Sequence, residues 1–224
     1  WSDRPQEVEK LRGQLRRIAG TTVGIFGLGS IGKAFAIRVR GFGPEKIIAH
    51  DPYVPQTTAD LFGVQLVDFD KLLAESDFIT VHSPATVETN HIFNIDAFRK
   101  MKSSAIFINC ARGPLVDEMG LQEALETGEI ISAGIDVTEA EPLDAESPLL
   151  KIDNLTISPH VAGTSEVSGR EGARRWGENA VNVLTGKALH GLGNPEVVKR
   201  IAVLRAQGPS RWDGIPDPVT VAWS

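Results

Sequence analysis

The feature that most constrains this fold is a regular alternation of short apolar segments with helix-like segments along most of the chain. The apolar segments are continuous in Val, Ile and Phe, which is expected of strands whose two faces are both covered by helices. Such alternation is typical of a parallel sheet with crossover helices. We therefore expect an α/β chain with a doubly wound parallel sheet, and no repeat of about 20–50 residues competes with it.

The segments can be assigned by residue range. The expected strands are Thr22–Phe26, Lys46–His50, Val64–Val67, Phe78–His82, Ala105–Asn109, Ser132–Val137 and Leu155–Ser158. The expected helices are Ile31–Gly41, Asp70–Glu75, Ile95–Met101, Glu118–Thr127 and Ser165–Leu184. A further charged helix is expected over Trp1–Ala19. From Ile201 onward, where prolines and tryptophans are crowded together, we expect an extended tail lying on a surface.

A glycine pattern follows the first expected strand and opens the first expected helix: Gly27, Gly29 and Gly32, with Ser30 and Ile31 between them. In this context the first glycine permits a tight turn, the second a close approach of the backbone to a pyrophosphate, and the third close packing of helix on strand. The N–H groups of Ser30 and Ile31 would then face the phosphates. The alternative is a strand-turn-helix in which the glycines serve packing alone.

Asp51 stands at the end of the second expected strand, nineteen residues after Gly32. A carboxylate about 20 residues on is placed to accept hydrogen bonds from the adenosine ribose hydroxyls. It would repel a 2′-phosphate, and no Lys or Arg follows within residues 52–54. The sequence thus favours NAD over NADP, although Asp51 could also be a simple turn former before Pro52.

Polar residues follow the other strand ends, where doubly wound sheets bind their ligands. They include Arg112 after the fifth strand, Asp136 and Glu141 after the sixth, and His160 after the seventh. Each alone has an ordinary structural explanation, such as a surface cation, a loop cap or a solvated acid. Together they would place a cation, a carboxylate and an imidazole at one edge, facing one cofactor.

Several stretches then resemble the D-isomer-specific 2-hydroxyacid dehydrogenase family, whose members include phosphoglycerate dehydrogenase and glyoxylate/hydroxypyruvate reductase. The matching stretches are TVGIFGLGSIGKAFAIRVRGFG, HDPY, VHSPATVETNHIFN, MKSSAIFINCARGPLVDE, AGIDVTEAEPL, SPHVAGTS, NAVNVLTGK and NPEV. They cover most of the chain from Arg12 to about Val198. The resemblance implies an NAD(P)-binding Rossmann-like domain and hydride transfer between NAD(H) and a small 2-keto or D-2-hydroxy acid.

The resemblance also implies roles for individual residues. It makes Arg112, Glu141 and His160 the catalytic set: His160 would donate a proton to the keto oxygen, Glu141 would orient the ring and favour its charged form, and Arg112 would bind the substrate carboxylate. It implies contacts to the ribose and nicotinamide side of NAD as well. Those contacts would come from Ser83, Cys110, Ala111, Arg112, Asp136, His160 and Gly163. No metal is needed for this chemistry.

The family further implies a division of the chain. Residues 1–19 would be a linker or arm helix, residues 20–186 the NAD-binding domain, and residues 187–224 a segment returning towards the substrate domain. In relatives about 100 residues precede the position of Trp1 and form much of that second domain, so we expect only one wall of the substrate cleft here. The family also dimerises through its cofactor domain, which predicts a homodimer.

Composition narrows the partners. A net charge of -6, with acids and bases interleaved, argues against nucleic acid, which requires a basic face. No apolar run reaches the roughly 18 residues that span a bilayer, and no signal peptide opens the chain. The single cysteine, Cys110, fits a reducing compartment, so we expect a cytoplasmic protein.

Two other functions compete with the dehydrogenase. Some members of the family act as NAD-responsive corepressors that bind protein partners, and they keep the same three catalytic residues. A different NAD-dependent enzyme, such as a hydrolase with bound NAD, is disfavoured by the order and spacing of Arg112, Glu141 and His160. The residues that would select the substrate are expected to lie largely in the second domain.

Overall fold

The computed structural model describes residues 16–185, 187, 197–209 and 214. The chain divides into two compact units, Trp1–Ala162 and Gly163–Ser224, and each is described by itself. The first unit ends at Ala162, whereas the sequence places the end of the cofactor domain at residue 186. The boundary at residue 186 stays a prediction. Within the described residues, no helix has both the length and the apolar character needed to cross a bilayer.

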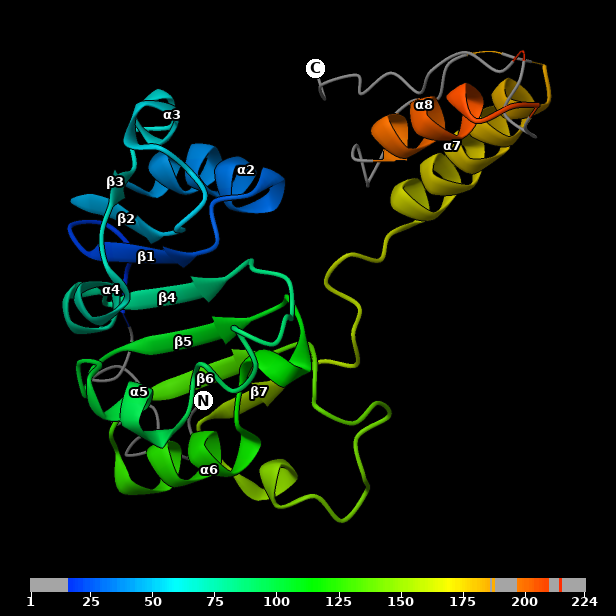
Figure 1. The fold of residues 1–224 in the computed structure, drawn as a ribbon. Coiled ribbons are helices and arrows are strands. Elements are labelled where there is room, and N and C mark those ends of the chain that lie inside the picture. The colour runs from blue at the N-terminus through cyan, green and yellow to red at the C-terminus, as the bar shows by residue number, and fades with distance from the viewer. Residues whose placement is uncertain (1–15, 186, 188–196, 210–213, 215–224) are drawn as a thin grey trace. The chain divides into compact units, whose positions relative to one another are not determined.

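The first unit is built on one sheet of seven parallel strands in the order β3-β2-β1-β4-β5-β6-β7. The arrows of β1, β4 and β5 run in the same direction (Figure 1). The strands are β1 Thr22–Phe26, β2 Lys46–His50, β3 Gln65–Leu66, β4 Phe78–Val81, β5 Ile106–Asn109, β6 Ser132–Ile135 and β7 Leu155–Ile157. The doubly wound parallel fold is confirmed, and several strands are one or two residues shorter than expected.

Helices connect the strands. They are α2 Ser30–Val39, α3 Gln56–Leu61, α4 Phe69–Glu75, α5 Ile95–Arg99 and α6 Glu118–Thr127, with short 3₁₀ helices η1 Arg40–Phe42, η2 Gly113–Leu115 and η3 Pro148–Lys151. Side chains of Asp68, Asn94 and Asp117 accept backbone N–H groups at the starts of α4, α5 and α6. These caps satisfy donors that have no partner inside the helix. The short helix α3 is an addition to the expected set.

Strand residues alternate between two cores on opposite faces of the sheet. Val23 and Ile25 of β1 pack with Ala36 and Val39 of α2. Phe26, the next residue of β1, belongs to the other core, where it joins residues of α4, α5 and α6. Both faces are therefore apolar, which explains why the strands are continuous in hydrophobic residues.

Two expectations outside the sheet were wrong in part. The second unit contains α7 Glu166–Leu184, as expected, and also α8 Val197–Ala206, so the chain from Ile201 to Ala206 is helical and not extended. The apolar residues Val197, Ile201 and Leu204 recur at helical spacing, but that pattern begins before the segment taken as a tail. Of the helix expected over residues 1–19, residues 1–15 lie outside the described residues. Residues 16–19 are not helical: the chain turns at residues 19–20, where Thr21 donates its N–H to the carbonyl of Ile18.

Candidate active site

The loop between β1 and α2 leaves no room for a side chain at two of its three glycines. A Cβ added to Gly27, whose φ is 93°, would lie 2.8 Å from the backbone nitrogen of Ser83. A Cβ added to Gly32 would lie 2.2 Å from the carbonyl oxygen of Gly27. A Cβ on Gly29, by contrast, would meet no atom within 4 Å. Two glycines thus close the turn against its neighbours, and the third leaves open space above it.

The N-terminus of α2 begins at this open space. Gly29 is the N-cap, no described side chain caps the helix, and the first turn holds no acid. Uncapped N–H groups and the helix dipole favour an anion. The residues present, including the expected Ser30 and Ile31, therefore fit the pyrophosphate of a dinucleotide.

Asp51 follows β2 at the same edge and is tied to the glycine loop. Its Oδ2 accepts the N–H of Leu28 at 2.8 Å, and its Oδ1 accepts the N–H of Tyr53 at 2.9 Å. These bonds fix the carboxylate beside the loop, while each oxygen keeps a further lone pair for a hydroxyl group. The position agrees with the ribose contact expected for Asp51.

The connection after β4 supports the glycine loop from the other side. Ser83, an expected cofactor contact, lies directly under Gly27. The ring of His82 is mostly buried, packs 5.4 Å from the ring of Phe35 on α2, and lies 3.1 Å from the hydroxyl of Thr80. Burial lowers the pKa of His82 to about 4, so the ring is neutral at physiological pH and cannot act as a cation for the phosphates.

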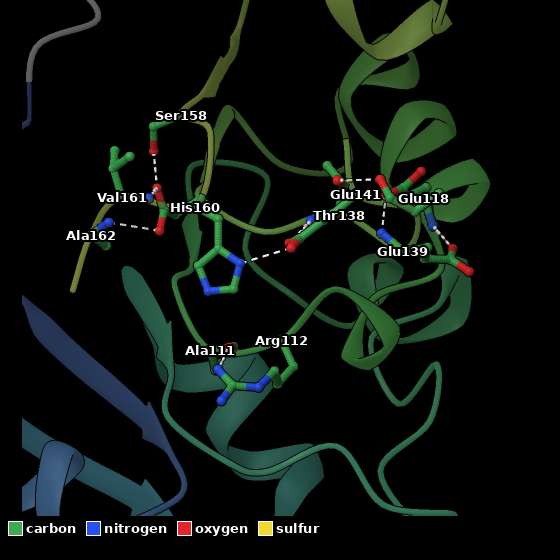
Figure 2. A network of polar contacts seen from close by, with 12 residues as sticks. Ala111, Arg112, Glu118, Thr138, Glu139, Glu141, Ser158, His160, Val161 and Ala162 are labelled. Carbon is green, nitrogen blue, oxygen red and sulfur yellow. Dashed lines mark hydrogen bonds and ion pairs between the residues drawn. The ribbon is translucent and has the colours of Figure 1, made fainter. Parts of the chain in front are cut away.

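His160 and Glu141 are brought together although they come from different loops. Nδ1 of His160, after β7, lies 2.8 Å from Oε2 of Glu141, in the loop after β6 (Figure 2). Because an ionised carboxylate can only accept, Nδ1 carries the proton and Nε2 stays free for an exchangeable proton. The hydrogen bond from His160 is the main reason that the pKa of Glu141 is lowered. This arrangement is suited to proton transfer at Nε2.

Asp136 anchors the turn that carries His160. Its buried carboxylate accepts the Ser158 hydroxyl at 2.5 Å and the N–H groups of Val161 and Ala162 at 2.9 and 2.8 Å (Figure 2). Burial alone would raise the pKa of Asp136, but these hydrogen bonds outweigh it and the pKa is lowered. His160 itself has a left-handed backbone with φ of 53°, which costs a non-glycine residue energy. Asp136 therefore fixes the chain before and after His160, whose backbone is strained.

Arg112 lies on the neighbouring loop after β5 (Figure 2). The side chain of Asn109 holds this loop by donating to the carbonyl of Arg112 and accepting the N–H of Ala111. The exposed guanidinium donates one bond, from Nη1 to the carbonyl of Ala111 at 2.6 Å, and none of the described carboxylates pairs with it. Its remaining donors are free for a planar anion such as a carboxylate. Cys110, beside it, is an exposed residue, but partial desolvation of its thiol, together with the charge of Asp136, raises the pKa of the thiol.

Most expected site residues thus lie at one edge of the sheet, but one cannot be placed with them. Gly163 is the first residue of the second unit, so its relation to the cofactor loop is not described. Sequence reasoning missed the anchoring side chains of Asn109 and Ser158, and a third group around Glu139. Asn109 and Ser158 stand at strand ends inside motifs that were recognised, and position at a strand end was the one available signal.

Comparison with known proteins agrees with this geometry. The model of the D-isomer specific 2-hydroxyacid dehydrogenase, NAD binding domain, matches residues 2–162. The chain is 40% identical over 182 residues to a glyoxylate reductase of Korarchaeum cryptofilum, covering 81% of this chain and 54% of that protein. It is 41% identical over 169 residues to a D-3-phosphoglycerate dehydrogenase of Archaeoglobus fulgidus, covering 75% and 32%. The chain therefore spans about a third to a half of the length of these curated relatives.

Solved structures give the same result. The holo form of the D-mandelate dehydrogenase of Rhodotorula graminis has a TM-score of 0.75 at 30% identity, covering 82% of this chain and 54% of that one. The NAD complex of a D-isomer specific 2-hydroxyacid dehydrogenase from Lactobacillus delbrueckii has a TM-score of 0.70 at 31% identity, covering 77% and 56%. The cofactor of the domain is NAD. Since the family model matches well over half of the residues, this chain belongs to the D-isomer specific 2-hydroxyacid dehydrogenase family and contains its NAD-binding domain.

Proposed function

We propose that the complete protein interconverts a small 2-keto acid and the corresponding D-2-hydroxy acid. The observation that carries this proposal is the His160–Glu141 pair, 2.8 Å apart at the same sheet edge as the glycine loop. NAD(H), when bound, supplies or accepts the hydride at the carbon that bears the oxygen. The chain's own residues then have to hold the substrate and move one proton.

In the reducing direction, His160 donates the proton from Nε2 to the oxygen that was the ketone. Glu141 holds Nδ1 and thereby fixes the orientation of the ring. Arg112 binds the substrate carboxylate through its free donors and polarises the carbonyl group. In the oxidising direction, the same imidazole accepts the hydroxyl proton.

The sharpest test replaces His160 by asparagine in the complete protein, assayed with NADH against a panel that includes glyoxylate, hydroxypyruvate and pyruvate. Turnover should fall by about a thousandfold or more, which is within the range for loss of a general acid and an orienting group together. NAD affinity, measured by calorimetry, should change far less than turnover, because the glycine loop and Asp51 are untouched. Normal turnover in this variant would sink the assignment of the proton donor.

The 224-residue chain alone should bind NAD and turn over weakly or not at all, because it spans only part of its relatives' length. Robust, saturable turnover by this chain would contradict that expectation. The corepressor alternative is not favoured, because the relatives are named as reductases and dehydrogenases. A cytoplasmic homodimer stays a prediction, and a monomer mass by light scattering at high concentration would count against the dimer.

A further inference from the structure

Glu139 lies two residues before Glu141, and its side chain is bonded to α6. Its Oε1 accepts the N–H of Glu118, the first residue of α6, at 3.1 Å. In return, the N–H of Glu139 donates to Oε1 of Glu118 at 2.6 Å (Figure 2). Each glutamate thus holds the backbone of the other, across 21 residues of sequence.

A third segment joins this pair. Nε2 of His91, in the connection between β4 and α5, lies 3.0 Å from Oε2 of Glu139. His91 is itself fixed, because its N–H donates to the carbonyl of Pro114 at 2.8 Å. Both oxygens of Glu139 are therefore bonded to parts of the fold outside its own loop.

The charges of Glu118, Glu139 and His91 show that this arrangement is more than a surface contact. The two carboxylates lie near each other, and burial together with the charge of Glu139 raises the pKa of Glu118. When it is protonated, His91 offsets the repulsion between the carboxylates through its contact with Glu139. Two solvated glutamates at a surface would move apart. Here the backbone N–H of each glutamate donates to the carboxylate of the other, which keeps the two side chains in place.

The loop that carries Glu141 needs such an external hold. Apart from the contact of Glu141 with His160, the side-chain bonds around Glu139 are internal to the loop: Thr138 donates its hydroxyl to the carbonyl of Ala140 and its N–H to Oε1 of Glu141. Internal bonds preserve the shape of a loop but do not fix its position. The carbonyl of Thr138 also packs against Gly113, where an added Cβ would lie 1.9 Å away, so the loops of Arg112 and Glu141 are in direct backbone contact.

We propose that Glu139 is a positioning residue, which, through its reciprocal bonds with Glu118 and its contact with His91, fixes the loop that presents Glu141 to His160. The proposal rests on the proposed function for its catalytic consequence. Its structural part concerns only where Glu141 lies. Glu139 does not touch the substrate or the cofactor in this account.

The test compares Glu139→Ala and Glu139→Gln with Glu146→Ala, which removes an exposed glutamate from the same β6–β7 connection. In the 224-residue chain, the titration of the Glu141 carboxyl is followed by ¹³C NMR. Its pKa, which the hydrogen bond from His160 lowers, should rise in Glu139→Ala because the loop no longer presents Glu141 to the ring. Glu139→Gln should show a smaller rise, since its amide oxygen can still accept from Glu118, and Glu146→Ala none.

In the complete protein, Glu139→Ala should lower kcat for the 2-keto acid by about tenfold, as expected for misplacement of a catalytic group by less than 1 Å. The KM for NADH should be unchanged, and Glu146→Ala should match the unmodified protein. A folded Glu139→Ala variant with an unchanged Glu141 titration and unchanged kcat would overturn the proposal. If that variant does not fold, Glu139→Gln decides in the same way.

The two proposals fail separately. If the complete protein reduces no 2-keto acid but Glu139→Ala still raises the pKa of Glu141, the proposed function falls and the positioning role stands. If turnover is present and Glu139→Ala lowers only thermal stability, the positioning role falls. A purely structural residue would give this second result.

Discussion

The two ends of the candidate site are built in different ways. The dinucleotide end, between β1 and α2, is formed by backbone, and its shape depends on side chains being absent at Gly27 and Gly32. The reaction end, after β5, β6 and β7, is formed by loops that buried or half-buried polar side chains hold in place, with Asp136 as the clearest case. Substitutions that add side-chain volume should therefore disrupt the dinucleotide end, whereas substitutions that remove hydrogen bonds should disrupt the reaction end.

The largest effect is expected at the dinucleotide end, from Gly32→Val. The new side chain would meet the carbonyl of Gly27, and overpacking of this kind costs about 1–3 kcal/mol while also displacing the loop. NAD affinity measured by calorimetry should fall by about a hundredfold or more, which corresponds to about 2.8 kcal/mol.

Two glycine variants sharpen this prediction. Gly29→Ala should leave the thermal midpoint near its original value, because a Cβ there meets no protein atom, but it should weaken NAD binding by crowding the pyrophosphate. Gly41→Ala, at a position with equally open space, should alter neither property. Tight NAD binding by Gly32→Val would show that the loop does not cradle the cofactor.

This difference in construction also explains what the sequence could predict. All the steric requirements of the dinucleotide end lie within six residues, Gly27 to Gly32, so their spacing is visible in the chain. The strands were equally visible, because both faces of the sheet demand continuous apolar residues. The family resemblance supplied the pairing of His160 with Glu141.

The hydrogen bonds that hold the reaction end could not be predicted in the same way. Asp136 reaches Ser158 across 22 residues, and His91 reaches Glu139 across 48, so these partners are set by tertiary contacts. Polar residues at strand ends have many possible partners, and nothing in their spacing selects one. The family resemblance implies that Asp136 contacts the cofactor, and that contact stays a prediction. Nothing in the spacing indicated that its carboxylate also accepts three donors of the His160 turn.

At the reaction end, Asp136→Asn should cost about 1.5–3 kcal/mol of the free energy of unfolding, the range for a hydrogen bond to a buried charged group. An amide nitrogen would face a backbone N–H of Val161 or Ala162, leaving at least one donor unsatisfied. Urea titration measures the loss. Asp153→Asn, at an exposed residue of the same β6–β7 connection, is the control and should be near neutral.

The same variant should change the pH dependence of stability. The pKa of Asp136 is lowered in the folded state, so its stabilising effect is complete above the unfolded-state pKa and is lost as pH falls through the folded-state value. The unmodified chain should therefore lose more stability between neutral and acidic pH than Asp136→Asn does. Equal losses in both proteins would show that this carboxylate is not the anchor of the turn.

A smaller effect is expected from Arg112→Lys in the complete protein. Lysine keeps the positive charge but loses the planar pair of donors, so the KM for the 2-keto acid should rise and kcat should fall. A combined loss of about tenfold to a hundredfold in kcat/KM corresponds to about 1.4–2.7 kcal/mol of transition-state binding. NAD affinity should fall much less than kcat/KM, since the charge is kept and the glycine loop and Asp51 are untouched. A loss confined to NAD binding would place Arg112 at the other end of the site.

The smallest effect concerns the choice between NAD and NADP, and it can be measured on this chain alone. The unmodified chain should bind NAD more tightly, because the carboxylate of Asp51 accepts hydrogen bonds from ribose hydroxyls and repels a 2′-phosphate. Asp51→Ala should weaken NAD binding severalfold and spare NADP binding. The ratio of the NAD affinity to the NADP affinity should therefore narrow by about tenfold, or about 1.4 kcal/mol.

Because Asp51 also accepts the N–H groups of Leu28 and Tyr53, part of the loss of NAD affinity in Asp51→Ala would come from a looser glycine loop. Asp51→Asn separates the two contributions: its amide oxygen can still accept one backbone N–H, but the negative charge is gone. If repulsion of the phosphate sets the preference, both variants should narrow the ratio. If anchoring of the glycine loop sets the preference, only Asp51→Ala should narrow the ratio. Equal or tighter binding of NADP than of NAD by the unmodified chain would contradict both explanations.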